Sequence, residues 1–231
     1  MDTIETVSKP VKKPNQKPGS KNVLVIAVHP DDETLGCGGT LLKHKSEGDI
    51  VGCVFVTSGN DHQKTLIDEV ARKYSFDYIE MLNKQEIVLD DLSLTELIPC
   101  LSEVIHKHRP SVMYVPNRSD SHSDHRKVWP AVAACIKSFR YPFIKRVLMC
   151  EVISETDFAP SVFENSFVPN VFVDITDFRR EKMEILNLYE KELLDDPHTR
   201  SISAVEALQR YRGSQASVQY ADAFMLIKEI C

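Results

Sequence analysis

VLVIAVHPDDETLGCGGT, residues 23–40, is the stretch that decides the fold. It opens with six apolar residues, most of them β-branched, and then changes abruptly to the polar run His29-Pro30-Asp31-Asp32-Glu33. A short, continuously apolar run is typical of a strand buried on both faces of a parallel sheet. The polar run would then lie at the carboxyl end of that strand, where open α/β sheets bind their ligands. We therefore predict a catalytic metal site at this corner of the sheet.

The segments after this stretch alternate between the patterns of helices and strands. Residues 34–48 place leucines at helical spacing and stop at a glycine, and residues 50–57 form a second apolar run. Because two strands joined by a helical crossover run parallel, their carboxyl ends lie at one edge of the sheet. Further helices are expected over residues 66–74, 93–108, 127–139, 178–194 and 201–211, and further strands over residues 76–82, 111–116, 147–153 and 168–175. This alternation predicts an α/β fold: a Rossmann-like, doubly wound, mostly parallel sheet flanked by helices, in a single domain.

At three places the sequence is compatible with two local structures. Pro99 lies inside a helical pattern and predicts either a kink or a late start of that helix. Either Ser201 or Ser203 caps the last expected helix, since serine is a good capping residue. The tail, residues 213–231, fits either a strand or a helix.

Gly36, Gly38 and Gly39 indicate that the chain passes very close to another part of the protein. Glycine inside a helix lowers stability relative to alanine, so a packing or ligand contact is the expected reason for it. The spacing differs from GxGxxG and follows the acidic residues, which argues against a dinucleotide site. We therefore expect these glycines to serve packing.

The composition is that of an ordinary globular domain. The 231 residues are 42% hydrophobic and 27% charged, enough for one sizeable core. The formal net charge is -6, and the part expected to fold contains no basic block, which argues against a nucleic-acid partner. No apolar run approaches the roughly 20 residues of a membrane span. Residues 1–21, rich in Lys and Pro, predict a disordered arm, and residues 22–231 the folded domain.

The six cysteines are widely scattered and form no CxxC pair. Such usage favours a reducing compartment, so we expect a cytoplasmic protein. The sequence leaves open whether the chain forms a homo-oligomer.

A second polar run follows the expected strand 111–116. Residues 117–126, NRSDSHSDHR, place His122 and His125 three residues apart, the same spacing as His29 and Asp32. A catalytic zinc site needs three ligands from His, Asp, Glu or Cys and an open position for water. A single histidine at a strand end is usually structural, and an aspartate that begins a helix is usually a cap. Two such runs at one sheet edge favour a metal site over these alternatives.

Both polar runs carry a family resemblance. HPDDE followed by LGCGG, and later HSDHR, resemble the motifs of the LmbE-like or PIG-L family of metal-dependent sugar de-N-acetylases. The tail RYRGSQASVQYADAF, residues 210–224, is also similar to the C-terminal region of that family. The resemblance therefore covers most of the chain.

The resemblance implies a role for each residue of the two runs. His29, Asp32 and His125 would be the ligands of a zinc ion, with iron(II) as the alternative metal. Asp31 would be the general base. His122 would steady the oxyanion or protonate the leaving amine, and Asp124 would orient a histidine. Which group protonates the amine stays open.

Residues that contact the substrate are expected in the second run and in the tail. Asn117 and Asp120 lie where the family's loop approaches the sugar, and Arg212 and Tyr220 would add polar contacts. The chain departs from the family after its second strand, where residues 58–62 read SGNDH without the usual Gly-Glu pair or an early arginine.

These features predict a metal-dependent hydrolase. It would remove an N-acetyl group from an N-acetylglucosamine-type sugar or sugar conjugate and release acetate and a free amino sugar. Its expected partner is thus a small-molecule sugar or sugar conjugate, without nucleic acid and without a membrane span. Two alternatives remain: an amidase that acts on a bulkier sugar-linked conjugate, and a non-catalytic carbohydrate-binding protein with the same fold.

Overall fold

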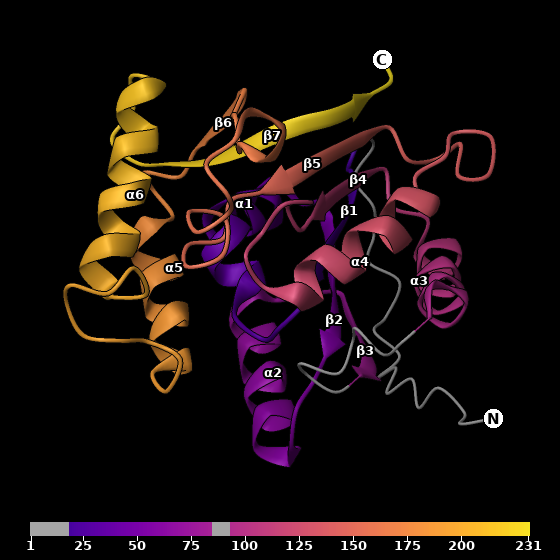
Figure 1. The fold of residues 1–231 in the computed structure, drawn as a ribbon, viewed down its shortest axis with the longest axis horizontal. Helices are drawn as coiled ribbons and strands as arrows, with labels where there is room; N and C mark the ends of the chain where they lie inside the picture. The colour runs from indigo at the N-terminus through magenta and orange to yellow at the C-terminus, as the bar shows by residue number, and fades with distance from the viewer. Residues whose placement is uncertain (1–18, 85–92) are drawn as a thin grey trace.

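A seven-stranded sheet with helices on both faces forms the centre of the protein (Figure 1). The computed structural model describes residues 19–84 and 93–231, so the predicted arm lies almost entirely outside the described residues. The elements are, in chain order, β1 (Asn22–Ala27), α1 (Asp32–Glu47), β2 (Ile50–Thr57), α2 (Asp61–Tyr74), β3 (Tyr78–Lys84), α3 (Leu94–His108), β4 (Val112–Val115), α4 (Ser123–Ala134), β5 (Arg146–Cys150), the 3-10 turn η2 (Phe163–Asn165), β6 (Val171–Asp174), α5 (Arg179–Leu186), the 3-10 turn η3 (Asn187–Tyr189), α6 (Ile202–Gln215) and β7 (Ala221–Glu229).

The strand order is β3-β2-β1-β4-β5-β7-β6. The five strands from β3 to β5 are parallel, and β7 runs antiparallel to both of its neighbours. The chain leaves β1 toward β2 on one side and later returns to β4 on the other side. The order therefore reverses between β1 and β4, which is the place where doubly wound sheets bind ligands. The predicted fold, one α/β domain with a doubly wound, mostly parallel sheet, is confirmed.

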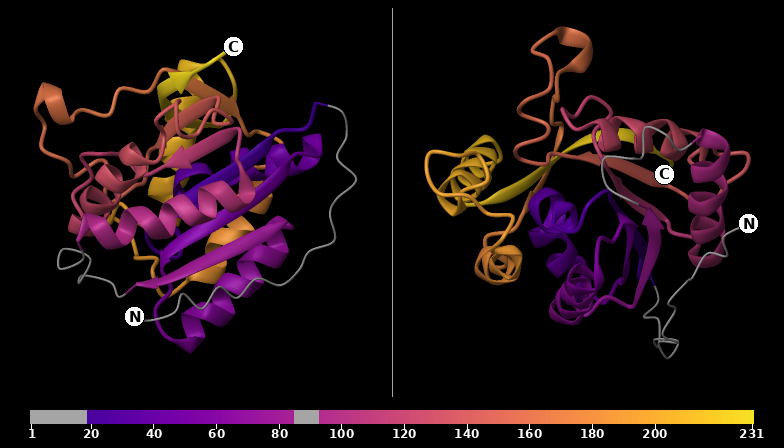
Figure 2. Two further views of the ribbon diagram at one scale, coloured as in Figure 1. Left: turned by 90° about the vertical axis from the view of Figure 1, so that its right-hand side faces the viewer. Right: turned by 60° about the horizontal axis from the view of Figure 1, so that its bottom comes forward.

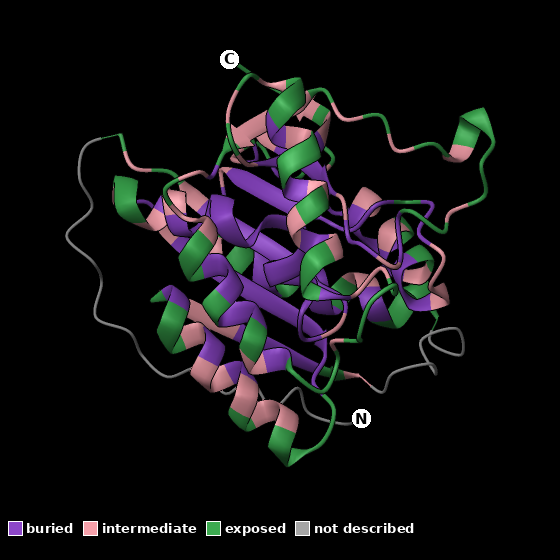
Figure 3. Cartoon of the chain, turned by 90° about the vertical axis from the view of Figure 1, so that its left-hand side faces the viewer, coloured by how far each residue is buried: buried purple, intermediate pink, exposed green. Residues whose placement is uncertain are grey.

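The sheet is buried on both faces because alternate residues of each strand point to opposite sides. Val23 and Val25 of β1 belong to the core beneath α1, α2 and α5, whereas Leu24 and Ile26 belong to the core beneath α3 and α4. Figure 2 shows the helices on the two sides of the sheet, and Figure 3 shows that the central strands are buried. The continuous apolar run in the sequence follows from this double burial.

Three helices begin earlier than their apolar patterns indicate. α1 begins at Asp32 instead of Thr34, α2 begins at Asp61 instead of Leu66, and α4 begins at Ser123 instead of Lys127. In α2 the Asn60 side chain accepts the backbone N–H groups of His62 and Gln63, and the Gln63 side chain accepts the backbone N–H of Asn60. Polar side chains thus start helices before the first apolar residue does. As a consequence, both polar runs extend into the first turn of a helix.

Other expected boundaries also change. Pro99 lies inside α3, which begins at Leu94, so the helix does not start late. Ser201, rather than Ser203, caps α6 and accepts the backbone N–H of Ala204. The tail ends as a strand, β7, because it fills the gap between β5 and β6 in the sheet. The expected strands 76–82, 147–153 and 168–175 and the expected helices 127–139 and 178–194 are present with shifted or shorter bounds.

The glycines of α1 serve close packing, as predicted. A Cβ atom at Gly36 would lie 2.9 Å from Cys150 Cβ, and one at Gly39 would lie 2.7 Å from Ile175 Cβ. At Gly38 it would collide with the hydroxyl of Tyr74. α1 can therefore approach β5, α2 and the end of β6 only because these positions carry no side chain. No helix in the described part of the chain is both long and apolar enough to cross a membrane.

Candidate active site

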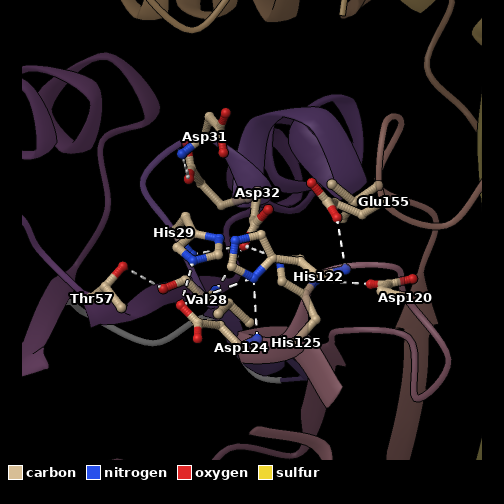
Figure 4. A network of polar contacts seen from close by, with 12 residues as sticks. Val28, His29, Asp31, Asp32, Thr57, Asp120, His122, Asp124, His125 and Glu155 are labelled. Atoms are coloured by element: carbon tan, nitrogen blue, oxygen red, sulfur yellow. Dashed lines mark hydrogen bonds and ion pairs between the residues drawn. The ribbon is translucent and has the colours of Figure 1, made fainter. Parts of the chain in front are cut away.

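Two neighbouring strands bring the two polar runs together. β1 pairs in parallel with β4, with Val25 opposite Tyr114. The chain passes from β1 through His29 into α1, and from β4 through the second run into α4. Figure 4 shows the side chains of both runs at the resulting corner of the sheet. The site therefore sits at the point where the strand order reverses.

Three predicted metal ligands meet at this corner. One ligand atom from each of His29, Asp32 and His125 lies within 4.8 Å of the other two. Asp32 Oδ2 accepts the backbone N–H groups of Val28, at 2.9 Å, and His29, at 2.8 Å. Asp32 Oδ1 and His125 Nε2 are buried and have no hydrogen-bond partner among the described residues. His125 Nε2 lies 3.3 Å from Oδ2 of the same carboxylate. A buried carboxylate and a buried imidazole side by side, each with an atom that makes no hydrogen bond, fit a metal ion.

The charges of two of these groups depend on each other. Burial by itself would raise the pKa of Asp32, but His125 and His29 hold it well below its ordinary value. Burial by itself would lower the pKa of His125, but Asp32 and Asp120 raise it well above its ordinary value. Asp32 is therefore a carboxylate at neutral pH, the form that binds a cation.

Asp120 and Asn117 lie behind His125. Asp120 Oδ2 is 2.8 Å from His125 Nδ1, and Asp120 Oδ1 accepts bonds from Asn117 Nδ2 at 2.9 Å and Thr156 Oγ1 at 2.8 Å. Asp120 is fully buried and Asn117 is 2% exposed. The structure thus places both residues inside the protein, where each oxygen of the Asp120 carboxylate has a partner, as a buried carboxylate requires.

Two other residues of the second run, Asp124 and His122, lie next to His29. Asp124 Oδ2 is 3.0 Å from His29 Nε2, so Asp124 contacts a histidine. His122 is the cap of α4, and its Nδ1 accepts the backbone N–H of Asp124 at 3.1 Å. His29, His122 and Asp124 also form a second group of the size that could hold a metal. The buried atoms of Asp32 and His125 that make no hydrogen bond favour the first group, His29, Asp32 and His125, as the metal site.

The cap contact decides which nitrogen of His122 can donate. Because Nδ1 accepts a backbone N–H, the proton of the neutral ring is on Nε2. Burial and the neighbouring His29 lower the pKa of His122 below its ordinary value. The neutral ring is therefore favoured, and its Nε2–H can still donate a hydrogen bond.

Asp31 is buried beside the predicted ligands and has an unusual backbone. Its φ is 128°, in the region that favours glycine, and its side chain is 3% exposed. Glu33 Oε2 accepts its backbone N–H at 3.2 Å. Burial raises the pKa of Asp31 well above its ordinary value, although Arg200 opposes the rise. A carboxyl whose pKa is shifted upward is a better proton acceptor near neutral pH than an exposed aspartate.

Two residues at the corner are absent from the predicted site. Arg200 Nη1 is 3.1 Å from Asp31 Oδ2, and its Nη2 is 3.4 Å from Glu155 Oε1. Glu155 lies in the polar residues 154–157 that follow β5, so its position after a strand is a signal that the sequence contains. Arg200 precedes α6 without a motif around it, and only the fold shows its place.

The two predicted tail residues are engaged elsewhere. Arg212 Nε donates to Glu151 Oε2 at 2.8 Å, just after β5. The hydroxyl of Tyr220 is 3.3 Å from Glu206 Oε1, and the Arg179 guanidinium lies 5.1 Å from the centre of its ring. Within the described residues, no hydrogen bond or ion pair joins either side chain to His29, Asp32 or His125.

The chain resembles known deacetylases over the residues that build this site. The PIG-L family, described as GlcNAc-PI de-N-acetylase, matches residues 24–136, which include both polar runs. The uncharacterized deacetylase YaiS of Escherichia coli K12 is 30% identical over 158 residues, which cover 63% of this chain and 82% of that protein. Diacetylchitobiose deacetylase of Thermococcus kodakarensis is 26% identical over 235 residues, which cover 91% of this chain and 84% of that protein.

Solved structures show the same fold. The crystal structure of the conserved protein TT1542 from Thermus thermophilus superposes with a TM-score of 0.75 at 25% identity, and the match covers 91% of this chain and 96% of that one. The similarity to YaiS extends over most of that protein, and the family match includes both polar runs. This chain therefore belongs to the PIG-L, or LmbE-like, family of deacetylases.

Proposed function

We propose that this protein is a zinc-dependent hydrolase that removes the N-acetyl group from an N-acetylglucosamine-type sugar or sugar conjugate. One observation carries the proposal: ligand atoms of His29, Asp32 and His125 gather at one point, where the buried Asp32 Oδ1 makes no hydrogen bond and His125 Nε2 lies 3.3 Å from Asp32 Oδ2, with Asp31 next to them in the chain. Membership of a deacetylase family supports the reaction, and the name of the Thermococcus relative supports an amino-sugar substrate.

His29, Asp32 and His125 would hold the metal through two imidazoles and one carboxylate. That set of donors suits zinc and also iron(II), so the metal in the cell is a matter for measurement. A bound metal ion would lower the pKa of water to about 7 and polarise the acetamide carbonyl. Asp120, behind His125, would hold that ring in the orientation that directs Nε2 inward.

Asp31 would move the proton, and His122 would stabilise the oxyanion. Asp31 accepts a proton from the attacking water while the water oxygen bonds to the acetamide carbon. The carbonyl oxygen then becomes an oxyanion. His122 Nε2–H donates a hydrogen bond to that oxyanion. The C–N bond then breaks, the amine nitrogen takes the proton that Asp31 accepted from water, and acetate and a free amino sugar leave. A neutral His122 would become an imidazolate if it gave up the proton on Nε2, so it serves as the hydrogen-bond donor.

Acetate release tests the proposal directly. Purified protein is incubated with N-acetylglucosamine, diacetylchitobiose, a nucleotide-linked and a lipid-linked N-acetyl sugar, and free amine and acetate are measured. We expect turnover of at least one compound, loss after chelation and recovery with zinc. His125→Ala should lose bound metal, whereas the control His106→Ala, on the exposed face of α3, should keep it. Sugar binding without acetate release would support a non-catalytic protein. Cleavage of the amide in a bulkier sugar-linked conjugate alone would support an amidase.

The remaining expectations stay predictions. The domain limits 22–231, a cytoplasmic location and self-association are of this kind. The substrate contacts expected from Asn117, Asp120, Arg212 and Tyr220 are predictions too. All six cysteines are free and five of them are buried, which supports a reducing compartment.

A further inference from the structure

Arg200 reaches the candidate active site from a part of the chain that carries neither polar run. It lies in the loop between η3 and α6, next to the cap residue Ser201 and outside the residues that match the family. Its side chain is only 19% exposed. Burying most of a guanidinium costs free energy unless it is paired, so the position of this side chain requires specific partners.

Those partners are two carboxylates from different parts of the site. Nη1 contacts Asp31 Oδ2 at 3.1 Å, and Nη2 contacts Glu155 Oε1 at 3.4 Å. The other oxygen of Glu155 accepts the hydroxyl of Ser121 at 2.9 Å and the backbone N–H of His122 at 3.1 Å. A continuous chain of contacts thus runs from Asp31 through Arg200 and Glu155 to the turn that carries His122.

Asp31 needs external support because its backbone is strained. A non-glycine residue in a rarely populated conformation costs on the order of 1–3 kcal/mol and persists only when its surroundings hold it there. Its φ of 128° is such a conformation. Glu33 holds the backbone N–H of Asp31, and Arg200 holds one oxygen of its carboxylate. The Asp31 carboxylate would otherwise be a buried charge without a counter-ion on that oxygen.

The flat, forked guanidinium suits this bridge better than an ammonium group would. Its two terminal nitrogens can contact two carboxylates at once in a fixed geometry, whereas lysine offers a single point charge. We propose that Arg200 is a positioning residue that holds the Asp31 carboxylate at a fixed place relative to His122. The inference rests on the proposed function, since it assigns Asp31 and His122 to the same reaction.

The kinetic test compares Arg200→Gln, Arg200→Lys and Glu155→Gln with the control Arg180→Gln, an arginine whose side chain is 89% exposed. We expect Arg200→Gln to lower kcat about tenfold to a hundredfold, as loss of a supporting partner commonly does, with little change in KM and full zinc content. Arg200→Lys should recover part of the loss. The double variant Arg200→Gln/Glu155→Gln should lose no more than the worse single variant, because both belong to one chain of contacts.

A measurement without substrate separates this inference from the proposed function. In metal-free protein, Arg200→Gln should lower the midpoint of thermal unfolding because it leaves the Asp31 carboxylate unpaired. In the double variant Arg200→Gln/Asp31→Asn, the unfolding midpoint should recover part of the way toward the wild-type value. Additive effects of the two substitutions would contradict the contact on which the inference depends.

The outcomes are distinct. If wild-type protein hydrolyses an acetylated sugar and Arg200→Gln keeps the kcat of Arg180→Gln, the inference is wrong and the proposed function stands. A raised KM with unchanged kcat would also overturn it, since Arg200 would then bind substrate. If the wild type turns over no compound, the proposed function fails, and the unfolding midpoints alone decide whether Arg200 and Asp31 are coupled.

Discussion

The carboxylate of Asp120 lies 2.8 Å from Nδ1 of His125, and both side chains are completely buried. The contact leaves Nε2 of His125 to face Asp32 Oδ2 at 3.3 Å. Histidines that bind metals usually donate their other ring N–H to a carboxylate in this way. The five-residue spacing from Asp120 to His125 is therefore part of the site as much as the three-residue spacing from His122 to His125.

Asp120→Asn should weaken zinc binding about tenfold to a hundredfold, because the amide can still contact His125 but no longer carries the charge that makes the ring a strong ligand. Competition with a chromophoric chelator measures the affinity. Asp61→Asn, at a fully exposed aspartate that begins α2, is the matched control. Equal zinc affinities of the two variants would show that Asp120 does not support the metal.

Asp31→Asn should keep zinc and lose turnover by about a hundredfold to ten-thousandfold, the usual contribution of a general base. The amide fills the same space but accepts no proton at neutral pH. Zinc content and acetate release are measured on the same sample. If the variant lost its zinc instead, Asp31 would be a ligand, and the division of work between Asp31 and Asp32 would have to be reversed.

Gly39→Ala should lower the free energy of unfolding by about 1–3 kcal/mol, the range found when a well-packed core is overfilled. The new Cβ would lie 2.7 Å from Cβ of Ile175, an atom close to the backbone that cannot move away freely. Denaturant unfolding measures the change. Ser46→Ala, on the exposed end of the same helix, is the control for helix propensity. A Gly39→Ala protein as stable as the control would contradict the packing role.

Stability should fall in acid partly through Glu80, on β3. Burial by itself would raise the pKa of Glu80, but hydrogen bonds from His108, at 2.6 Å, and Lys107, at 2.8 Å, hold it below its ordinary value of 4.5. Because the pKa is lower in the folded protein, this stabilisation is fully present above pH 4.5 and is lost as the pH falls through the folded pKa.

The pH dependence of unfolding tests this point. Glu80→Gln should flatten the fall in unfolding free energy below pH 4.5, whereas Glu184→Gln, at a carboxylate whose side chain is 58% exposed, should leave it unchanged. The same acid slope in Glu80→Gln as in the wild type would mean that other carboxylates carry the effect.

Local patterns predicted the elements that depend on local burial. The strand at residues 50–57 has the predicted bounds, and the glycines of α1 pack as expected, because continuous burial and close approach both restrict residue type directly. The start of α2 was also readable, since Asn60 and Gln63 form a capping pair. The start of α4 was not, because His122 lies outside the usual set of capping residues.

The sequence by itself determined that each polar run follows an apolar strand at the same edge of the sheet, and hence that His29, Asp32 and His125 could meet. That the two strands are neighbours came from the structure. Only the tertiary structure decided what surrounds the three side chains: Asp120 behind His125, and Arg200 between Asp31 and Glu155. Periodicity and motif spacing record contacts between residues close in the chain. A buried carboxylate needs a donor or a counter-ion, but the folded chain can supply it from any distance in the sequence, as Arg200 shows.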